Sequence, residues 1–245
     1  MPKRTIQRIY EESWSAYLSR GKGIPTGDNE FANQIAFLVG SQKHCLDIGC
    51  GTGKCMLALS RLGNKVIGVD VSPSAITICK SLGLEVLLLD IESDEIDPLL
   101  DYSPFDVIIM TDILEHLIDP IEVLSKIRTL LKKDGTVIAT VPNFVYFRYR
   151  FSLLLGNIPH FGNDDATGYD PPRPYNLGHK TLFNRSNLEQ TFKLSGFSRV
   201  IVVPELFSES LKPLWRIPVF RNIRLLAKKI WPTMLAARFL VIAHK

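Results

Sequence analysis

Glycine and acidic residues gather in one stretch of this chain, and their spacing would suit a nucleotide-like ligand. The stretch from Leu46 to Gly53 reads L-D-I-G-C-G-T-G and lies between a short apolar run and an apolar helical pattern. Glycines let a backbone approach a ligand closely and adopt angles that a side chain would forbid. Asp70 ends the next apolar run, 19 residues after Gly51. Its carboxylate can accept hydrogen bonds from both hydroxyls of a ribose.

The details of this glycine loop separate three classes of ligand. A phosphate-binding Walker loop requires G-x-x-x-x-G-K-[ST], but Ile48 and Cys55 stand where it needs the first glycine and the hydroxyl residue. A dinucleotide fingerprint requires G-x-G-x-x-G, and its last position falls on Lys54. An NAD-type oxidoreductase is therefore a disfavoured alternative. The observed pattern is G-x-G-x-G with Asp47 two residues ahead.

Apolar runs alternate with helical patterns, which predicts the elements that must position these residues. Strands are expected at 44–48, 65–70, 85–89, 105–110, 136–141, 197–203 and 237–243. Helices are expected near 53–62, from Ser72-Pro73 onward, at 121–131 and near 187–195, with an irregular insertion at 143–178. The alternation indicates an α/β fold, a Rossmann-like three-layer sandwich around a mostly parallel seven-stranded sheet. Open sheets of this kind bind ligands at the carboxyl ends of their strands.

The loop with Asp47 resembles the first motif of class I S-adenosylmethionine-dependent methyltransferases. A second segment, Thr111–Leu117, reads T-D-I-L-E-H-L. It resembles the D-x-L-E-H-L segment of the methyltransferases that include quinone-biosynthesis O-methyltransferases. The resemblance covers residues 40–204 and is best between 45 and 143. It implies S-adenosyl-L-methionine as cofactor, S-adenosyl-L-homocysteine as product, and an antiparallel last strand.

The resemblance also assigns cofactor roles to residues at the ends of the first four strands. Asp90 would accept a hydrogen bond from the adenine amino group, Ile91 would pack on the ring, and Thr111 would lie against the methionine part. The expected cofactor-binding residues are Asp47, Gly49, Gly51, Gly53, Asp70, Val71, Asp90, Ile91, Thr111 and Asp112. The cofactor carries a sulfonium cation and no phosphate, so a site rich in carboxylates suits its charge.

Two histidines are the candidate catalytic residues, since an oxygen acceptor must lose its proton during methyl transfer. His116 follows the fourth strand, near the expected position of the methyl group. His179 lies in a G-H-x-x-x-F segment that resembles one lining the acceptor pocket of related enzymes. A purely structural role is the competing interpretation for each. No metal is expected, because Asn143 alone does not replace the clustered carboxylates of metal-dependent relatives.

The chain is expected to form one class I methyltransferase domain over residues 1–245. Its parts are N-terminal cap helices at 1–40, a cofactor-binding core at 41–142, an acceptor-side insertion at 143–185, and a C-terminal part with a basic tail at 186–245. The aromatic residues of the insertion suit either a lid over a small acceptor or packing on the core. Tyr10, Trp14 and Tyr17 recur at helical spacing, which favours a packing face over a cofactor cover.

Charge is divided unevenly between the two halves of the chain. Residues 1–142 hold 14 Lys and Arg against 19 Asp and Glu, whereas residues 143–245 hold 15 against 6. The basic half favours an acidic, phosphorylated or membrane-associated acceptor, whether a small molecule or a lipid- or sugar-linked one. The segment 212–231 mixes Lys and Arg with Trp, which suits peripheral contact with an anionic membrane. The alternative for this segment is a decorating helix with a solvated basic face.

The remaining features indicate the compartment and leave two functional alternatives. The first residues lack the apolar core of a secretory signal, and four cysteines without a C-x-x-C pair suggest buried thiols in the cytoplasm. One alternative is a non-enzymatic or regulatory binder of the cofactor. The other, nucleic-acid methylation, is disfavoured because no Asn/Asp-Pro-Pro-Tyr motif of base-amino methylases follows the fourth strand.

Overall fold

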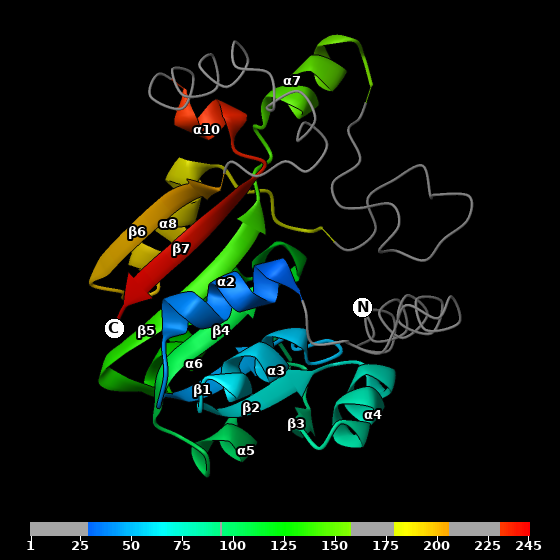
Figure 1. Ribbon diagram of the computed structural model, residues 1–245. Coiled ribbons are helices and arrows are strands. Elements are labelled where there is room, and N and C mark those ends of the chain that lie inside the picture. The colour runs from blue at the N-terminus through cyan, green and yellow to red at the C-terminus, as the bar shows by residue number, and fades with distance from the viewer. Residues whose placement is uncertain (1–28, 94, 158–178, 206–230) are drawn as a thin grey trace.

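A seven-stranded sheet forms the centre of the computed structural model, which describes residues 29–93, 95–157, 179–205 and 231–245 (Figure 1). The strands are β1 (His44–Ile48), β2 (Lys65–Asp70), β3 (Glu85–Leu88), β4 (Phe105–Thr111), β5 (Leu131–Pro142), β6 (Arg199–Glu205) and β7 (Arg238–His244). Their order is β3-β2-β1-β4-β5-β7-β6. The first five pair in parallel, and β7 runs antiparallel to both of its neighbours, β5 and β6. The expected fold class, with its antiparallel last strand, is confirmed.

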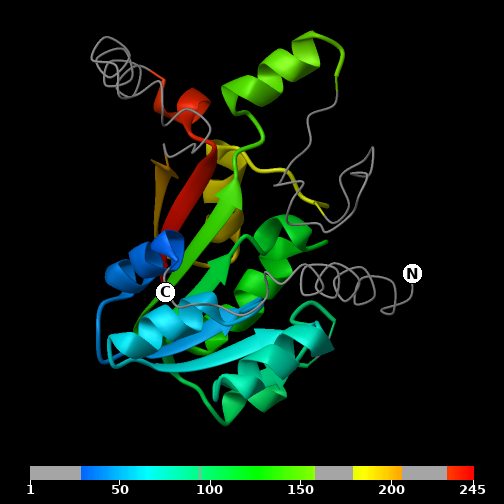
Figure 2. The ribbon, with the colours of Figure 1, turned by 45° about the vertical axis from the view of Figure 1, so that its right-hand side comes forward.

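Helices cover both faces of the sheet and make it the middle of three layers (Figures 1 and 2). One face carries α2 (Glu30–Val39), α3 (Lys54–Arg61) and α4 (Pro73–Ser81), and the other carries α5 (Asp97–Leu100), α6 (Pro120–Thr129) and α8 (Arg185–Leu194). In β4, Val107 and Ile109 belong to the core beneath the first group, whereas Ile108 and Met110 belong to the core beneath the second. Apolar strands buried on both faces are typical of parallel sheets between helices.

Local sequence signals explain where several helices begin. Ser72 starts α4 and Asp119 starts α6, each by accepting a hydrogen bond from the backbone N–H three residues further on. Asn184 and Asn187 form a reciprocal capping box at the start of α8. Each cap satisfies N–H groups that have no partner inside the helix.

Three expectations about the middle of the chain are wrong. The helix expected at 121–131 ends at Thr129, and the strand expected at 136–141 already begins at Leu131. Leu131 pairs with Phe105 ahead of a register shift, so the exposed charged residues 132–134 lie in an irregular strand rather than at a helix end. The insertion expected to be irregular contains α7 (Phe147–Leu154), a helix without buried residues.

One groove on the surface of the described residues lies away from the expected cofactor residues. A groove of about 740 Å³ runs along α2, and its lining is Glu30, Asn33, Gln34, Phe37 and Leu38. The groove includes none of the expected cofactor residues.

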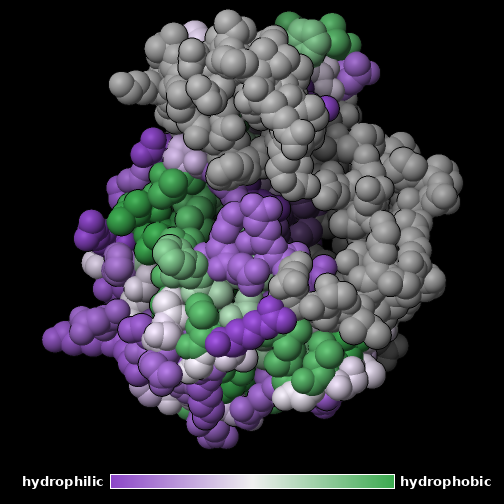
Figure 3. Space-filling view, viewed as in Figure 1, coloured by the Kyte–Doolittle hydropathy of each residue, from purple (hydrophilic) through white to green (hydrophobic). Residues whose placement is uncertain are grey.

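Figure 3 shows hydrophobic residues gathered over β6 and β7, beside α2. Across the part of the chain that the structure describes, none of the helices is both long and apolar enough to span a bilayer.

Candidate functional site

The carboxyl ends of β1, β2, β3 and β4 meet at one edge of the sheet because these strands are parallel neighbours. The glycine loop follows β1, Asp70 ends β2, Asp90 lies just beyond β3, and Thr111 ends β4. Tertiary structure thus brings the expected cofactor residues to a single edge, where sheets of this type bind ligands.

The glycine loop has a backbone conformation that side chains would oppose. Gly49, Gly51 and Gly53 have φ angles of 71°, 52° and 80°. A Cβ atom on Gly49 would lie 2.5 Å from two side-chain carbons of Ile113, and one on Gly53 would lie 2.4 Å from Leu84. Glycine is therefore required both for the left-handed turns and for close packing of the loop on its neighbours.

Asp70 fastens this loop to the end of β2. Its Oδ2 atom accepts a hydrogen bond of 2.8 Å from the backbone N–H of Gly51, and its Oδ1 atom accepts one of 2.9 Å from Ser72. The side chain is buried. Each carboxylate oxygen can accept two hydrogen bonds, so holding the loop is compatible with holding a ribose as well. Val71, the next residue, is half-buried.

Asp90 shapes the turn that follows β3. One carboxylate oxygen accepts from the backbone N–H of Glu92 at 3.1 Å, and the other accepts from the Ser93 hydroxyl at 2.6 Å. Ile91 is buried and belongs to the larger core. The two residues therefore have structural roles in addition to the adenine contacts that the sequence suggests.

Asp47 precedes the glycines of the loop and is almost completely buried. It is 1% exposed, and its Oδ1 atom has no hydrogen-bond partner among the described residues. Burial, followed by the negative charge of Asp70, raises the pKa of Asp47 to about 8. A cation bound beside it would favour the ionised form, as the sulfonium of the expected cofactor would.

Asp112 is tied to the last strand through a residue that sequence reasoning missed. Its Oδ2 atom forms an ion pair of 2.8 Å with Arg238 of β7, and its Oδ1 atom accepts from the Thr140 hydroxyl at 3.1 Å. Asp112 has a φ of 53°, a left-handed conformation that aspartate tolerates better than most residues. Thr111, one residue earlier, is half-buried.

His116 and His179 are brought into contact next to this edge. Their ring centroids lie 4.8 Å apart at an interplanar angle of 68°. The backbone carbonyl of Glu115 accepts from the N–H groups of Lys180 and Thr181, at 2.7 and 3.1 Å. These bonds fasten the segment after His179 to η1 (Leu114–His116), the short helix that follows β4.

The groups beside the two histidines change the acidity of this cluster. Glu115 is 3% exposed, and burial, with the charge of Asp112, raises its pKa well above the usual range. Burial also lowers the pKa of His179, which favours its neutral imidazole. A neutral imidazole can accept a proton or bind a cation.

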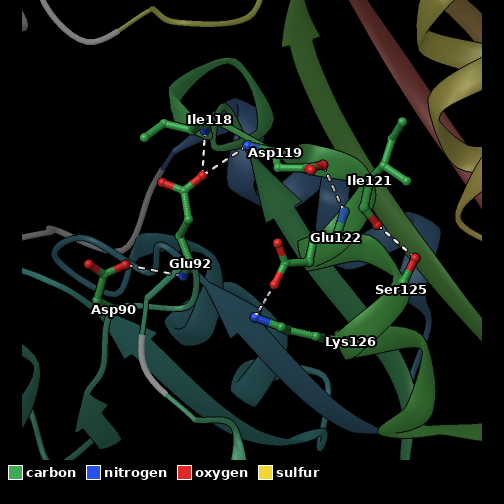
Figure 4. Close-up of polar contacts among 8 residues, drawn as sticks. All are labelled: Asp90, Glu92, Ile118, Asp119, Ile121, Glu122, Ser125 and Lys126. Atoms are coloured by element: carbon green, nitrogen blue, oxygen red, sulfur yellow. Dashed lines mark hydrogen bonds and ion pairs between the residues drawn. The ribbon is translucent and has the colours of Figure 1, made fainter. Parts of the chain in front are cut away.

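Glu92 connects the turn after β3 to the loop after β4 (Figure 4). Its Oε1 atom accepts hydrogen bonds from the backbone N–H groups of Ile118 and Asp119. Its Oε2 atom lies 3.7 Å from the Lys180 ammonium. Glu92 thereby joins three segments of the site. No motif marks it, because its partners lie far along the chain.

Several sequence predictions fall wholly or partly outside the described residues. They include the N-terminal aromatic face, most of the aromatic insertion, and the basic segment up to residue 230. In the described part of the insertion, Tyr146 is buried against Phe147 and Tyr149. Phe151 and Leu154 are exposed by 61% and 81%. The start of the insertion therefore combines a packing role with an apolar surface.

Comparison with known proteins gives consistent matches. A family model described as a methyltransferase domain matches residues 27–201. The ubiquinone biosynthesis O-methyltransferase of Coxiella burnetii (strain Dugway 5J108-111) is 32% identical over 114 residues, which cover 46% of this chain and 49% of that protein. The corresponding protein of Nitrosococcus oceani is 32% identical over 128 residues, which cover 51% and 53%. The chain thus spans about half the length of the curated relatives it matches.

Solved structures share the fold at lower sequence identity. A SAM-dependent methyltransferase from Archaeoglobus fulgidus has a TM-score of 0.56 and 20% identity, covering 86% of this chain and 90% of that one. The plantazolicin methyltransferase BpumL, solved with a monoazolic desmethylPZN analog and SAH, has a TM-score of 0.54 and 17% identity, covering 99% of this chain and 90% of that one. The fold agrees with these structures, and the family model matches most of the chain. The chain therefore belongs to the methyltransferase domain family, and its fold is that of solved SAM-dependent methyltransferases.

Proposed function

We propose that this chain transfers the methyl group of S-adenosylmethionine to an oxygen atom of a small-molecule or lipid- or sugar-linked acceptor. One observation carries the proposal. The glycine loop and its acidic neighbours share a sheet edge with η1, and η1 holds His116 in ring contact with His179. The candidate cofactor-binding residues and two histidines that could accept the proton of the acceptor thus lie at the same edge.

The cofactor half of the proposal follows from the chemistry at this edge. The ribose hydroxyls would donate to Asp70, the adenine amino group to Asp90, and the methionine part would lie along Thr111 and the glycine loop. Asp47, once ionised by the nearby sulfonium cation of the cofactor, would add negative charge there, whereas the charge of Asp112 is already paired with Arg238. The residues that we assign to the cofactor are therefore those of the sequence analysis.

The acceptor half is supported by the two histidines and by the relatives. The curated relatives are named as O-methyltransferases. A hydroxyl acceptor must lose its proton, and we assign this role to the group that contains His116 and His179. Transfer is an in-line displacement: the oxygen–carbon bond forms as the carbon–sulfur bond breaks, and the electron pair stays on sulfur. Alignment of the two reactants supplies much of the rate.

Calorimetry with S-adenosylmethionine and with NAD tests the cofactor half. We expect binding of S-adenosylmethionine and none of NAD, and the reverse would favour an oxidoreductase.

Formation of S-adenosylhomocysteine across a panel of catechols and hydroxylated aromatic acids then tests the part of the proposal that concerns the acceptor. Turnover should fall at least about 100-fold in His116→Ala or His179→Ala, the usual range for a proton-handling residue. Near-normal turnover in both variants would contradict their role.

The basic segment 212–231 is the proposed site of peripheral membrane contact for a protein that works in the cytoplasm. Its Lys, Arg and Trp content supports this proposal. Co-sedimentation with vesicles should increase with the fraction of anionic lipid and decrease with salt. Equal sedimentation with neutral and anionic vesicles would rule out an electrostatic membrane contact and leave a solvated basic surface.

A further inference from the structure

The turn after β3 carries the two residues that we assign to the adenine ring and, directly after them, a side chain that reaches out of the cofactor site. The carboxylate of Asp90 accepts a hydrogen bond of 3.1 Å from the backbone N–H of Glu92. Ile91, between them, is buried in the larger core. The backbone position of Glu92 is therefore set by the residues that would contact the adenine.

The Glu92 carboxylate contacts two other segments, one with each oxygen. Its Oε1 atom accepts from the backbone N–H groups of Ile118 and Asp119 in the loop after β4 (Figure 4). Its Oε2 atom lies 3.7 Å from the ammonium group of Lys180. The side chains of Glu92 and Lys180 are only 20% and 28% exposed, so solvent screens their attraction in part. One carboxylate thus bridges the adenine turn, the loop after β4 and the segment that contains His179.

We call residues 179–184, which precede α8, the strap. The backbone N–H groups of Lys180 and Thr181 donate to the carbonyl of Glu115 at 2.7 and 3.1 Å, which fixes the strap against η1. His179 lies at the start of the strap, in ring contact with the other candidate histidine. A contact that holds Lys180 in place therefore also holds the acceptor side of the site.

We propose that Glu92 couples the cofactor site to the acceptor side, as a positioning residue that contacts neither reactant. The inference rests on the proposed function, in which the adenine binds at Asp90 and Ile91. Bound adenine would restrain the turn, the turn would restrain Glu92, and Glu92 would hold the loop after β4 and the strap. Coupling between two sites is reciprocal, so an acceptor held beside His179 would raise the affinity for the cofactor by the same factor.

The coupling gives the two reactants a preferred order of binding. Without the cofactor, the turn, the loop and the strap become ordered only when the acceptor binds, and this ordering costs conformational entropy at that step. With the cofactor bound, the three segments are already held together and the acceptor enters an assembled site. Transfer of the methyl group needs this close alignment of the two reactants.

Hydrogen exchange of the full chain, with and without S-adenosylhomocysteine, tests the coupling and needs no acceptor. In the wild type, the bound ligand should slow exchange at the amides of Lys180 and Thr181 at least about 5-fold, the lower end of the usual range for coupled sites. In Glu92→Ala this ligand-dependent slowing should disappear. Each protein is compared with itself, so a general loosening of the variant does not imitate the result.

Further variants separate the two contacts of the carboxylate. Lys180→Met removes the ion pair and leaves the loop contacts, so slowing should persist at Ile118 and Asp119 and be lost in the strap. Glu92→Gln keeps one acceptor oxygen and should retain part of the slowing at the loop. Glu95→Gln, at an exposed position, is the matched control and should behave as the wild type does.

Calorimetry on the same samples reports whether S-adenosylhomocysteine binds, which separates this inference from the proposed function. Ligand binding by the wild type without slower exchange in the strap overturns the coupling and leaves the cofactor part of the proposed function standing. Slowing that persists in Glu92→Ala shows that Glu92 does not carry the coupling. Failure of the wild type to bind the ligand contradicts the proposed function, and the coupling with it.

Discussion

Gly49 combines a left-handed backbone with a neighbour that leaves no room for a side chain. Its φ is 71°, and an added Cβ would lie 2.5 Å from the Cδ1 and Cγ1 atoms of Ile113. Ile113 directly follows Asp112 and packs against the larger core. A change at Gly49 would therefore reach the loop after β4 as well as the glycine loop itself.

Gly49→Ala should destabilise the chain more than Gly83→Ala, the matched control. Gly83 has a φ of 74° but nothing within 4 Å of an added Cβ, so its substitution carries only the backbone cost of about 1–2 kcal/mol. Gly49→Ala adds displacement of Ile113, for about 1–3 kcal/mol more. Urea unfolding measures both, and calorimetry should show weaker cofactor binding only at Gly49. Equal losses of stability would mean that Ile113 moves aside at no cost.

Asp47 makes the stability of the cofactor-free chain depend on pH. Its pKa is about 8 in the folded chain and 3.8 as the ordinary value. Between these values the folded state holds a proton that the unfolded state has lost, so the free energy of unfolding falls as pH rises from about 4 to about 8. The slope approaches 1.4 kcal/mol per pH unit.

Asp47→Asn should remove this slope. The variant and the wild type would be close in stability near pH 4, and the variant would be the more stable one at pH 8. Urea unfolding at intervals between pH 5 and pH 8 gives the comparison, and groups common to both proteins cancel in the difference. Parallel profiles would show that Asp47 is ionised in the folded chain despite its burial.

At the scale of elements, parallel strands bring the site together and side chains in the loops fix its shape. β1, β2 and β4 end at one edge, but the loop after β4 is held by Glu92 from the neighbouring turn. The same loop begins α6, where Asp119 caps the helix. One carboxylate therefore links the start of a core helix to the group around His179.

Glu92→Ala should loosen this loop without unfolding the sheet. Two backbone N–H groups lose a charged acceptor, and we expect a loss of about 1–3 kcal/mol. Hydrogen exchange at the amides of Ile118 and Asp119 should become faster. Glu92→Gln keeps one acceptor oxygen and should lose less, while Glu95→Ala, at an exposed position, should change neither property. Unaltered exchange in Glu92→Ala would show that other contacts hold the loop.

In the molecule as a whole, β7 links the C-terminal part of the chain to the sheet edge that holds the candidate cofactor residues. It lies between β5 and β6, and its first residue, Arg238, pairs with Asp112 and lies over the ring of Phe31 from α2 at 4.9 Å. Asp112 and Arg238 are both about one-third exposed, so solvent screens their attraction in part.

Arg238→Ala should lower the free energy of unfolding more than Asp112→Asn does, since only the arginine also contacts an aromatic ring. A double-mutant cycle should give a coupling of up to about 1 kcal/mol, as is usual for partly exposed ion pairs. The coupling should shrink in high salt. Additive effects of the two substitutions would show that the ion pair contributes nothing to stability.

The order of the strands and helices along the chain, the glycine loop, and the acidic residues after successive strands could all be predicted from the amino-acid sequence. These features are local: apolar runs, caps and glycines act within a few residues, and parallel pairing then places the strand ends together. The same local reasoning failed at Leu131, where pairing with Phe105 overrode a helix-like pattern. It also missed α7, which buries none of its residues.

Contacts between side chains that lie far apart in the sequence could not be predicted and depend on how the chain folds. Arg238 reaches Asp112, Lys180 reaches Glu92, and His179 reaches Glu115 and His116 because separate segments pack at one sheet edge. No periodicity or spacing encodes these contacts, since each depends on how far a loop returns towards the sheet. The cofactor-binding residues could therefore be predicted from the sequence, whereas the contacts between the His179 segment and the loop after β4 could be found only in the fold.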